Sequence, residues 1–156
     1  MTLITETGTG VADATSYLSL ADADGHFAAL ALDDWSSATE GQREQALIRA
    51  SLHIDSYSYP GTVLSWDQGL KWPRSAVYDR DGRVLSGLPH ALRTAALELA
   101  ATFLEDTQGL DGRRTVKEKV GALELTYEAS GRTGSFVYRL LRQIGARVSA
   151  QTLARG

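Results

Sequence analysis

The chain has 156 residues, of which 43% are hydrophobic, so it is long and apolar enough for one domain with a modest core. Its formal net charge of -3 gives no positive field that would draw the whole molecule to nucleic acid or to an anionic membrane. The lack of cysteine excludes disulfides and thiolate metal ligands, and no apolar run reaches the length of a membrane span. The first residues lack the pattern of a signal peptide, so we expect a soluble protein that is not secreted through a cleaved signal.

Charge is distributed unevenly between the two ends. Residues 1–42 hold seven carboxylates and no lysine or arginine, whereas the residues after Glu128 hold five arginines and no carboxylate side chain. Oppositely charged ends can meet when copies of a chain associate head to tail, so the pattern favours an interface between subunits. Two solvated ends with an accidental bias are the alternative.

The chain begins with a segment of little apolar periodicity, residues 1–18, which we expect to form an extended arm. A first helix follows, with Ser19 as its N-cap and Asp22 in its first turn. Its apolar face is predicted to run to about Ala31, and Gly25 weakens the helix by about 1 kcal/mol relative to alanine.

Two longer helices carry stronger periodic patterns. The capping-box pattern Ser37–Glu40 starts one helix, which is predicted to run to about Tyr57 before a Pro-Gly pair ends it. A long connection over 61–87 follows. Pro89 then suits the first turn of another helix, which ends near Gly109.

The apolar period changes from helical to alternating beyond residue 114. Segments 115–120 and 123–128 flank Gly121-Ala122, a pair that suits a type II′ turn, so the sequence predicts a β-hairpin. A two-stranded hairpin is marginal in water and needs a surface to lie on. A last helix runs to about Val148, and 149–156 carry no further pattern.

The predicted fold is therefore mainly α: a small bundle of about four helices with one β-hairpin and extended N- and C-terminal segments. One helical domain over 19–148 includes the hairpin 115–128. The arm 1–18 precedes it and the flexible tail 149–156 follows it.

No group of residues typical of an enzyme occurs in the chain. His26, His53 and His90 lack the spacing of metal ligands, and the sequence has no phosphate loop, dinucleotide fingerprint or nucleophile elbow. Gly131–Ser135 superficially suggests an anion nest, but no strand of a parallel sheet leads into it. We expect no catalytic residue, no metal and no cofactor; a small hydrolase is the enzymatic alternative.

The stretch Leu70–Ser75, with the sequence LKWPRS, has two interpretations. In the first it is a structural corner, in which Trp66 and Trp72 are buried, Pro73 fixes a turn and Arg74 pairs with an acid. In the second, aromatic and basic residues form a platform for single-stranded DNA. The residues available for that platform are Trp66, Lys71, Trp72, Arg74, Tyr78, Arg80 and Arg83. The acidic net charge and the presence of only three lysines favour the corner.

Several short motifs, in this order and spacing, resemble small phage head–tail connector (adaptor) proteins over about residues 11–145. They are DATSYLSLADAD at 13–24, QALIRAS at 45–51, YPG at 59–61, LKWPR at 70–74 and EKVGALELTY at 118–127. Sequences of this kind are also labelled DnaT-like single-stranded-DNA-binding proteins. A replication accessory protein that binds single-stranded DNA is therefore the alternative function.

The resemblance implies a structural protein in the neck of a phage or phage-like particle, assembled in the host cytoplasm. It would form a homo-oligomeric ring, commonly of twelve copies, between the portal protein and the stopper or tail-completion protein. The ring would extend the channel through which DNA passes during packaging, without sequence-specific binding. It would have no cofactor and no membrane contact.

Two sets of contact residues follow from this resemblance as hypotheses. The C-terminal segment would dock on the portal through Arg139, Leu140, Leu141, Arg142, Ile144, Arg147 and Val148. The hairpin would contact a neighbouring subunit or the next ring through Val116, Lys119, Val120, Leu123, Leu125 and Tyr127.

Overall fold

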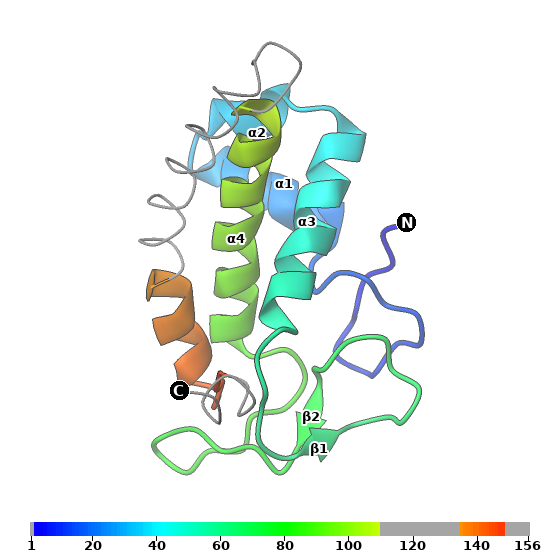
Figure 1. The fold of residues 1–156 in the computed structure, drawn as a ribbon, viewed down its shortest axis with the longest axis vertical. Coiled ribbons are helices and arrows are strands. Elements are labelled where there is room, and N and C mark those ends of the chain that lie inside the picture. Colours follow the sequence, from blue (N-terminus) through cyan, green and yellow to red (C-terminus); the bar gives the residue numbers. More distant parts are fainter. Residues whose placement is uncertain (1, 110–134, 149–156) are drawn as a thin grey trace, which may run out of the picture.

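A computed structural model describes residues 2–109 and 135–148 of the chain, and this part is mainly helical (Figure 1). The elements are α1 (Leu20–Ala29), α2 (Asp33–Ser37), α3 (Glu40–Ile54), β1 (Thr62–Val63), β2 (Arg74–Ser75) and α4 (His90–Gly109). Residues 135–142 are also helical. The predicted hairpin 115–128 and the predicted tail 149–156 lie outside the described residues, so the six hairpin contacts stay predictions.

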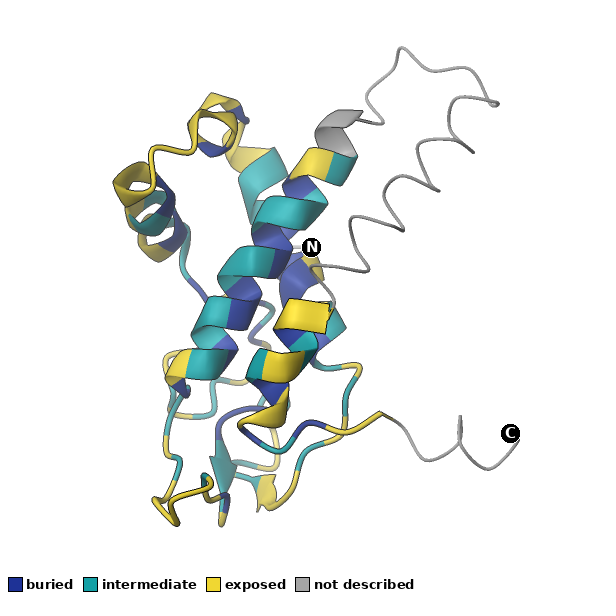
Figure 2. Ribbon diagram, turned by 90° about the vertical axis from the view of Figure 1, so that its left-hand side faces the viewer, coloured by how far each residue is buried: buried dark blue, intermediate teal, exposed yellow. Residues whose placement is uncertain are grey.

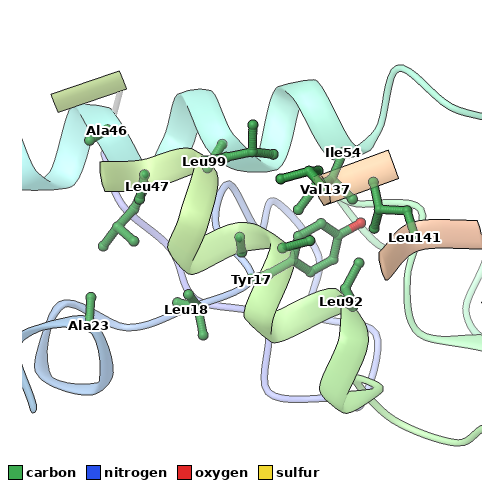
Figure 3. Packing of buried hydrophobic residues seen from close by; sticks show 14 of the residues in the cluster. Tyr17, Leu18, Ala23, Ala46, Leu47, Ile54, Leu92, Leu99, Val137 and Leu141 are labelled. Atoms are coloured by element: carbon green, nitrogen blue, oxygen red, sulfur yellow. The ribbon is translucent and has the colours of Figure 1, made fainter. Parts of the chain in front are cut away.

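The helices α3 and α4 pack along the long axis of the molecule, with α1 and α2 toward one end and the small sheet at the other (Figure 1). Side chains from α1, α3, α4 and the last helical segment form one hydrophobic core with those of the N-terminal segment (Figure 3). Leu47 and Ile54 of α3, Leu92 of α4 and Leu141 of the last helical segment are all almost completely buried. Burying such side chains contributes roughly 1.5–3 kcal/mol each, which makes this cluster the main source of stability.

Local signals place three helix boundaries. The Ser19 side chain accepts a hydrogen bond from the Asp22 N–H, which confirms the predicted start of α1. The capping box of α3 is Thr39 with Gln42, two residues after the predicted one. The residues before it form the short helix α2 instead, because Trp35 turns inward to contact Phe27, with ring centroids 4.5 Å apart.

The helix α4 begins at His90 and ends at Gly109, within a residue of the prediction. Alanines on its buried side, Ala95, Ala96 and Ala100, leave room for α3 to approach closely. The burial pattern in Figure 2 follows this arrangement, with buried residues along the inner sides of the helices. In the described part of the chain, no helix is both long and apolar enough to cross a membrane.

The N-terminal segment has no regular helix but packs into the domain instead of standing free as an arm. Tyr17 and Leu18 belong to the core, with exposed fractions of 0% and 1%. The buried carboxylate of Glu6 accepts hydrogen bonds from four consecutive backbone N–H groups, those of residues 8–11. Gly8 and Gly10 have positive φ angles of 91° and 84°, which lets the backbone wrap around that carboxylate.

The long connection contains two tight turns: the sequence pattern Asp79–Gly82 is typical of the second, whereas the strand pairing at the first was not predicted. Strands β1 and β2 pair antiparallel, with Thr62 opposite Ser75 and Val63 opposite Arg74. A second tight turn follows over 77–85, closed by a bridge between Tyr78 and Val84. Both turns lie in the half of the molecule away from α2 (Figure 1).

Candidate functional site

The LKWPRS stretch has a buried half, in which Trp72 and Pro73 are almost inaccessible to solvent. Tyr17 connects this half to α3: its hydroxyl donates to Asp55 and accepts a hydrogen bond from the Trp72 N–H at 3.2 Å. The second oxygen of Asp55 accepts from the Lys71 N–H at 3.1 Å. The N-terminal segment, α3 and the long connection therefore meet in one hydrogen-bonded corner.

Burial dominates the electrostatics of this corner. It raises the pKa of Asp55, although the hydrogen bonds from Tyr17 and the Lys71 N–H oppose that shift. Burial and the neighbouring Asp55 carboxyl raise the pKa of the Tyr17 hydroxyl far above its usual range. The Trp72 indole N–H is buried without a hydrogen-bond partner among the described residues. Tyr17, Asp55 and the Lys71 and Trp72 N–H groups are paired with each other and shielded from water, which is the arrangement of a structural site.

The two cations of the stretch are tied to backbone carbonyl groups. Arg74 donates to the carbonyl oxygens of Pro60, Gly61 and Lys71, and its charge also acts on the nearby Asp55 carboxyl. Among the described residues it forms no direct ion pair with an acid. Lys71 donates from Nζ to the Tyr57 carbonyl oxygen at 2.7 Å. Neither side chain projects freely toward a ligand.

Trp66 is not part of the corner. Its exposed fraction is 92%, so the prediction that it is buried there is wrong. The loop between β1 and β2 carries it outward, while Gln68 of the same loop turns back and bonds the carbonyl oxygens of Leu70 and Pro73. One tryptophan of this region is thus core and the other is surface.

The residues predicted to dock on the portal fall into a buried group and a more exposed group. Leu141 and Ile144 are buried in this chain's own core, so they are not available to fill a groove on another protein. Leu140 is half-buried, and Arg147 is held by backbone hydrogen bonds in both directions with Ser58. The exposed members are Arg139, Arg142, Arg147 and Val148.

Two of these arginines line a groove of about 750 Å³ together with the turn over 79–83. The lining residues are Asp79, Arg80, Asp81, Arg83, Arg139, Arg142 and Gln143. Four arginines from two distant segments therefore line one groove together with two aspartates, and we call it the arginine groove. The sequence offered Arg80 with Arg83 and Arg139 with Arg142 as separate sets, and nothing in it indicated that they meet.

Asp79 organises the turn that supplies half of the groove. Its Oδ1 accepts from the N–H groups of Asp81 and Arg83, and its Oδ2 accepts from Arg83 Nε at 2.7 Å. These hydrogen bonds lower the pKa of the Asp79 carboxyl, so it stays ionised and holds Arg83. Across residues 2–109 and 135–148, Arg80, Arg139 and Arg142 form no ion pair.

Stacked side chains fix the other half of the groove. The rings of Tyr57, three residues after the end of α3, and Tyr138 are stacked, with centroids 5.5 Å apart. The guanidinium of Arg142 lies 5.8 Å from the centre of the Tyr138 ring. This arrangement anchors the helical segment and directs the side chain of Arg142 along the groove.

No cluster of three or more His, Cys, Asp or Glu side chains that could hold a metal ion occurs among the described residues. The chemistry that the groove offers is instead that of a cationic surface. Guanidinium groups bind phosphate and carboxylate oxygens through paired hydrogen bonds.

A family model described as "Putative DnaT-like ssDNA binding protein" matches residues 1–154. The chain belongs to this family. No curated protein and no solved structure matches it. The resemblance to head–tail connector proteins finds no support in these comparisons, whereas the alternative label, DnaT-like, is the one that the family carries.

Proposed function

We propose that the protein binds single-stranded DNA and that the arginine groove holds the phosphate backbone. The observation that carries this proposal is the meeting of Arg80, Arg83, Arg139 and Arg142 in one groove of a chain whose net charge is negative. Membership of a family described as DnaT-like and single-stranded-DNA-binding supports it.

The groove suits a phosphate backbone because three of its arginines form no ion pair within the described residues. Within the described part of the chain, an entering strand would displace no carboxylate from these three side chains. Arg83 is already neutralised by Asp79, at 2.7 Å, and contributes less. If about three phosphates are contacted, the logarithm of the association constant should fall with a slope of about -2 against the logarithm of salt concentration.

An aromatic side chain lies next to the groove in sequence. Tyr78 precedes Asp79 directly and is 60% exposed. Exposed aromatic rings stack on unpaired bases, which a duplex does not present. Tyr78 therefore gives the proposed site a means of preferring single strands.

The test is a titration of a dye-labelled oligo(dT) strand followed by fluorescence anisotropy at several salt concentrations. The wild-type protein should bind with a clear salt dependence, and unlabelled duplex should compete poorly. The double variant R139E/R142E should bind at least about tenfold more weakly and reduce the magnitude of the salt slope by about 1.4. Both side chains are exposed, so the variant should keep its helical circular dichroism spectrum.

The matched control is R93E, which reverses one charge on α4 outside the groove, at an arginine paired with Asp22 at 3.4 Å. It should bind DNA like the wild-type protein. Equal binding by R139E/R142E and the wild-type protein, or binding that ignores salt, would overturn the proposal.

A further inference from the structure

Trp66 is a large apolar side chain left almost entirely in water. Its exposed fraction is 92%, whereas Trp35 and Trp72 are exposed by 3% and 0%. Leu64 in the same loop is 50% exposed. Tryptophan contributes disproportionately to the binding energy of protein interfaces, so the loop has the composition of a contact surface.

The loop that carries Trp66 is fixed in place before any partner binds. Gln68 accepts from the Ser65 N–H at 2.9 Å and donates to the carbonyl oxygens of Leu70 and Pro73. The Gly69 N–H donates to the Val11 carbonyl oxygen at 3.0 Å, which pins the base of the loop to the N-terminal segment. A contact made by such a loop loses little conformational entropy on binding.

The charge next to Trp66 indicates which kind of partner the loop fits. Asp67 is exposed at the tip, where its carboxylate accepts a hydrogen bond from the Ser65 hydroxyl at 2.6 Å. The nearby cations Lys71 and Arg74 are engaged with backbone carbonyl groups. An indole beside a carboxylate, without a free cation, repels phosphate and matches a cationic protein surface.

The arginine groove of a second copy provides that surface. Guanidinium groups stack on indole rings and donate hydrogen bonds to carboxylates, so the arginines of the groove can contact both Trp66 and Asp67. The groove is open to solvent on one side, and its volume of about 750 Å³ has room for the side chains of Trp66 and Asp67 together.

The two surfaces lie on opposite sides of the molecule. In Figure 1 the loop between β1 and β2 projects to the right, and helical residues 135–142 lie to the left. The Trp66 loop cannot reach the arginine groove of its own copy across that separation, but it can reach the groove of another copy. Such a contact is heterologous and builds a chain or a closed ring.

We propose that the Trp66 loop of one copy docks in the arginine groove of a second copy, so that the protein self-associates head to tail. The bound loop covers the guanidinium groups proposed above to hold DNA. Self-association and DNA binding then exclude each other at the groove; this competition, unlike the contact itself, rests on the proposed function.

Sedimentation velocity over a range of protein concentrations tests the contact without DNA. The wild-type protein should form species larger than a monomer. W66A and R139E/R142E should each weaken self-association by about tenfold or more, because each removes one side of the contact. The controls L52A, which truncates an exposed leucine on α3, and R93E should associate like the wild-type protein.

A mixing experiment separates this arrangement from any symmetric one. W66A keeps an intact groove and R139E/R142E keeps an intact loop, so an equimolar mixture should form a one-to-one dimer that neither variant forms alone. A wild-type protein that stays monomeric, oligomers that persist in both variants, or a mixture that remains monomeric would overturn the proposed contact.

Titration of the oligo(dT) strand completes the test. Strand binding should dissociate the wild-type oligomer, and W66A should bind the strand at least as tightly as the wild-type protein. If the wild-type protein sediments as a monomer and W66A binds the strand more weakly, Trp66 is a platform for bases and the self-contact is overturned. If the oligomer forms and needs both surfaces but ignores DNA, the contact stands and the proposed function fails.

Discussion

Trp66 and Trp72 lie in one connection between two helices, yet the first is in solvent and the second is in the core. The residues next to them do not decide the difference alone, since each tryptophan has a charged neighbour, Asp67 or Lys71. It comes from Tyr17, whose hydroxyl accepts a hydrogen bond from the Trp72 N–H, and from Asp55, which accepts one from the N–H of the preceding Lys71. Distant partners thus decide whether an aromatic side chain in a connection stabilises the fold or is presented at the surface.

The largest expected effect contrasts the two tryptophans directly. Trp72→Ala should lower the free energy of unfolding by about 3–5 kcal/mol, because it removes a fully buried ring, whereas Trp66→Ala should change it by no more than about 0.5 kcal/mol. Urea unfolding followed by circular dichroism measures both without relying on tryptophan emission. Trp72→Phe, which fills more of the space, serves if the alanine variant does not fold.

Similar losses of stability for the two alanine variants would contradict the division of the connection into a core half and a surface half. A loss confined to Trp66→Ala would reverse it.

The corner that receives Trp72 should respond next most strongly. Tyr17→Phe removes a hydroxyl that donates to Asp55 and accepts from the Trp72 N–H, and leaves both buried groups without that partner. We expect a loss of about 1–3 kcal/mol in the free energy of unfolding. Tyr78→Phe, at a tyrosine that is 60% exposed, is the matched control and should leave stability unchanged.

The pH dependence of the same corner has a definite sign. Burial raises the folded-state pKa of Asp55 above its usual value of 3.8, so the folded state holds its proton more tightly than the unfolded state. The resulting stability is present below the unfolded pKa and is lost as pH rises through the folded pKa. Asp55→Asn does not titrate, so its stability relative to the wild-type protein should increase with pH across that window; a constant difference would contradict this.

Helix boundaries were the part of the fold that local sequence could predict. Ser19 caps α1, and α4 begins and ends within a residue of the predicted positions, because caps and apolar periodicity act over a few residues. The capping box of α3 was misplaced because Ser37–Glu40 and Thr39–Gln42 both fit the pattern. The inward turn of Trp35 onto Phe27, a contact between helices, decides between them.

The candidate site was less accessible to prediction because it depends on pairing across the chain. Arg80 and Arg139 share a groove because the rings of Tyr57 and Tyr138 stack and because Asp79 closes the turn that carries Arg80. The uneven charge of the two ends predicted an interaction surface that includes the C-terminal arginines, and this stays a prediction. It could not indicate that Leu141 on the same segment belongs to the core.

The smallest expected effect concerns His53, which lies between the core and the surface. Its ring contacts those of Tyr57 and Phe103, and burial lowers its pKa below 6.5, so the folded state binds its proton less readily than the unfolded state. Stability should therefore fall as pH drops below 6.5, and His53→Gln should remove part of that fall. Thermal unfolding between neutral and mildly acidic pH measures it, with His90→Gln, at an exposed position, as the control. Because Tyr57 also stacks on Tyr138, we expect His53→Gln to reduce the loss of DNA binding at acidic pH as well. If the pH profile of DNA binding is the same in His53→Gln and the wild-type protein, the ring contacts do not connect His53 to the groove.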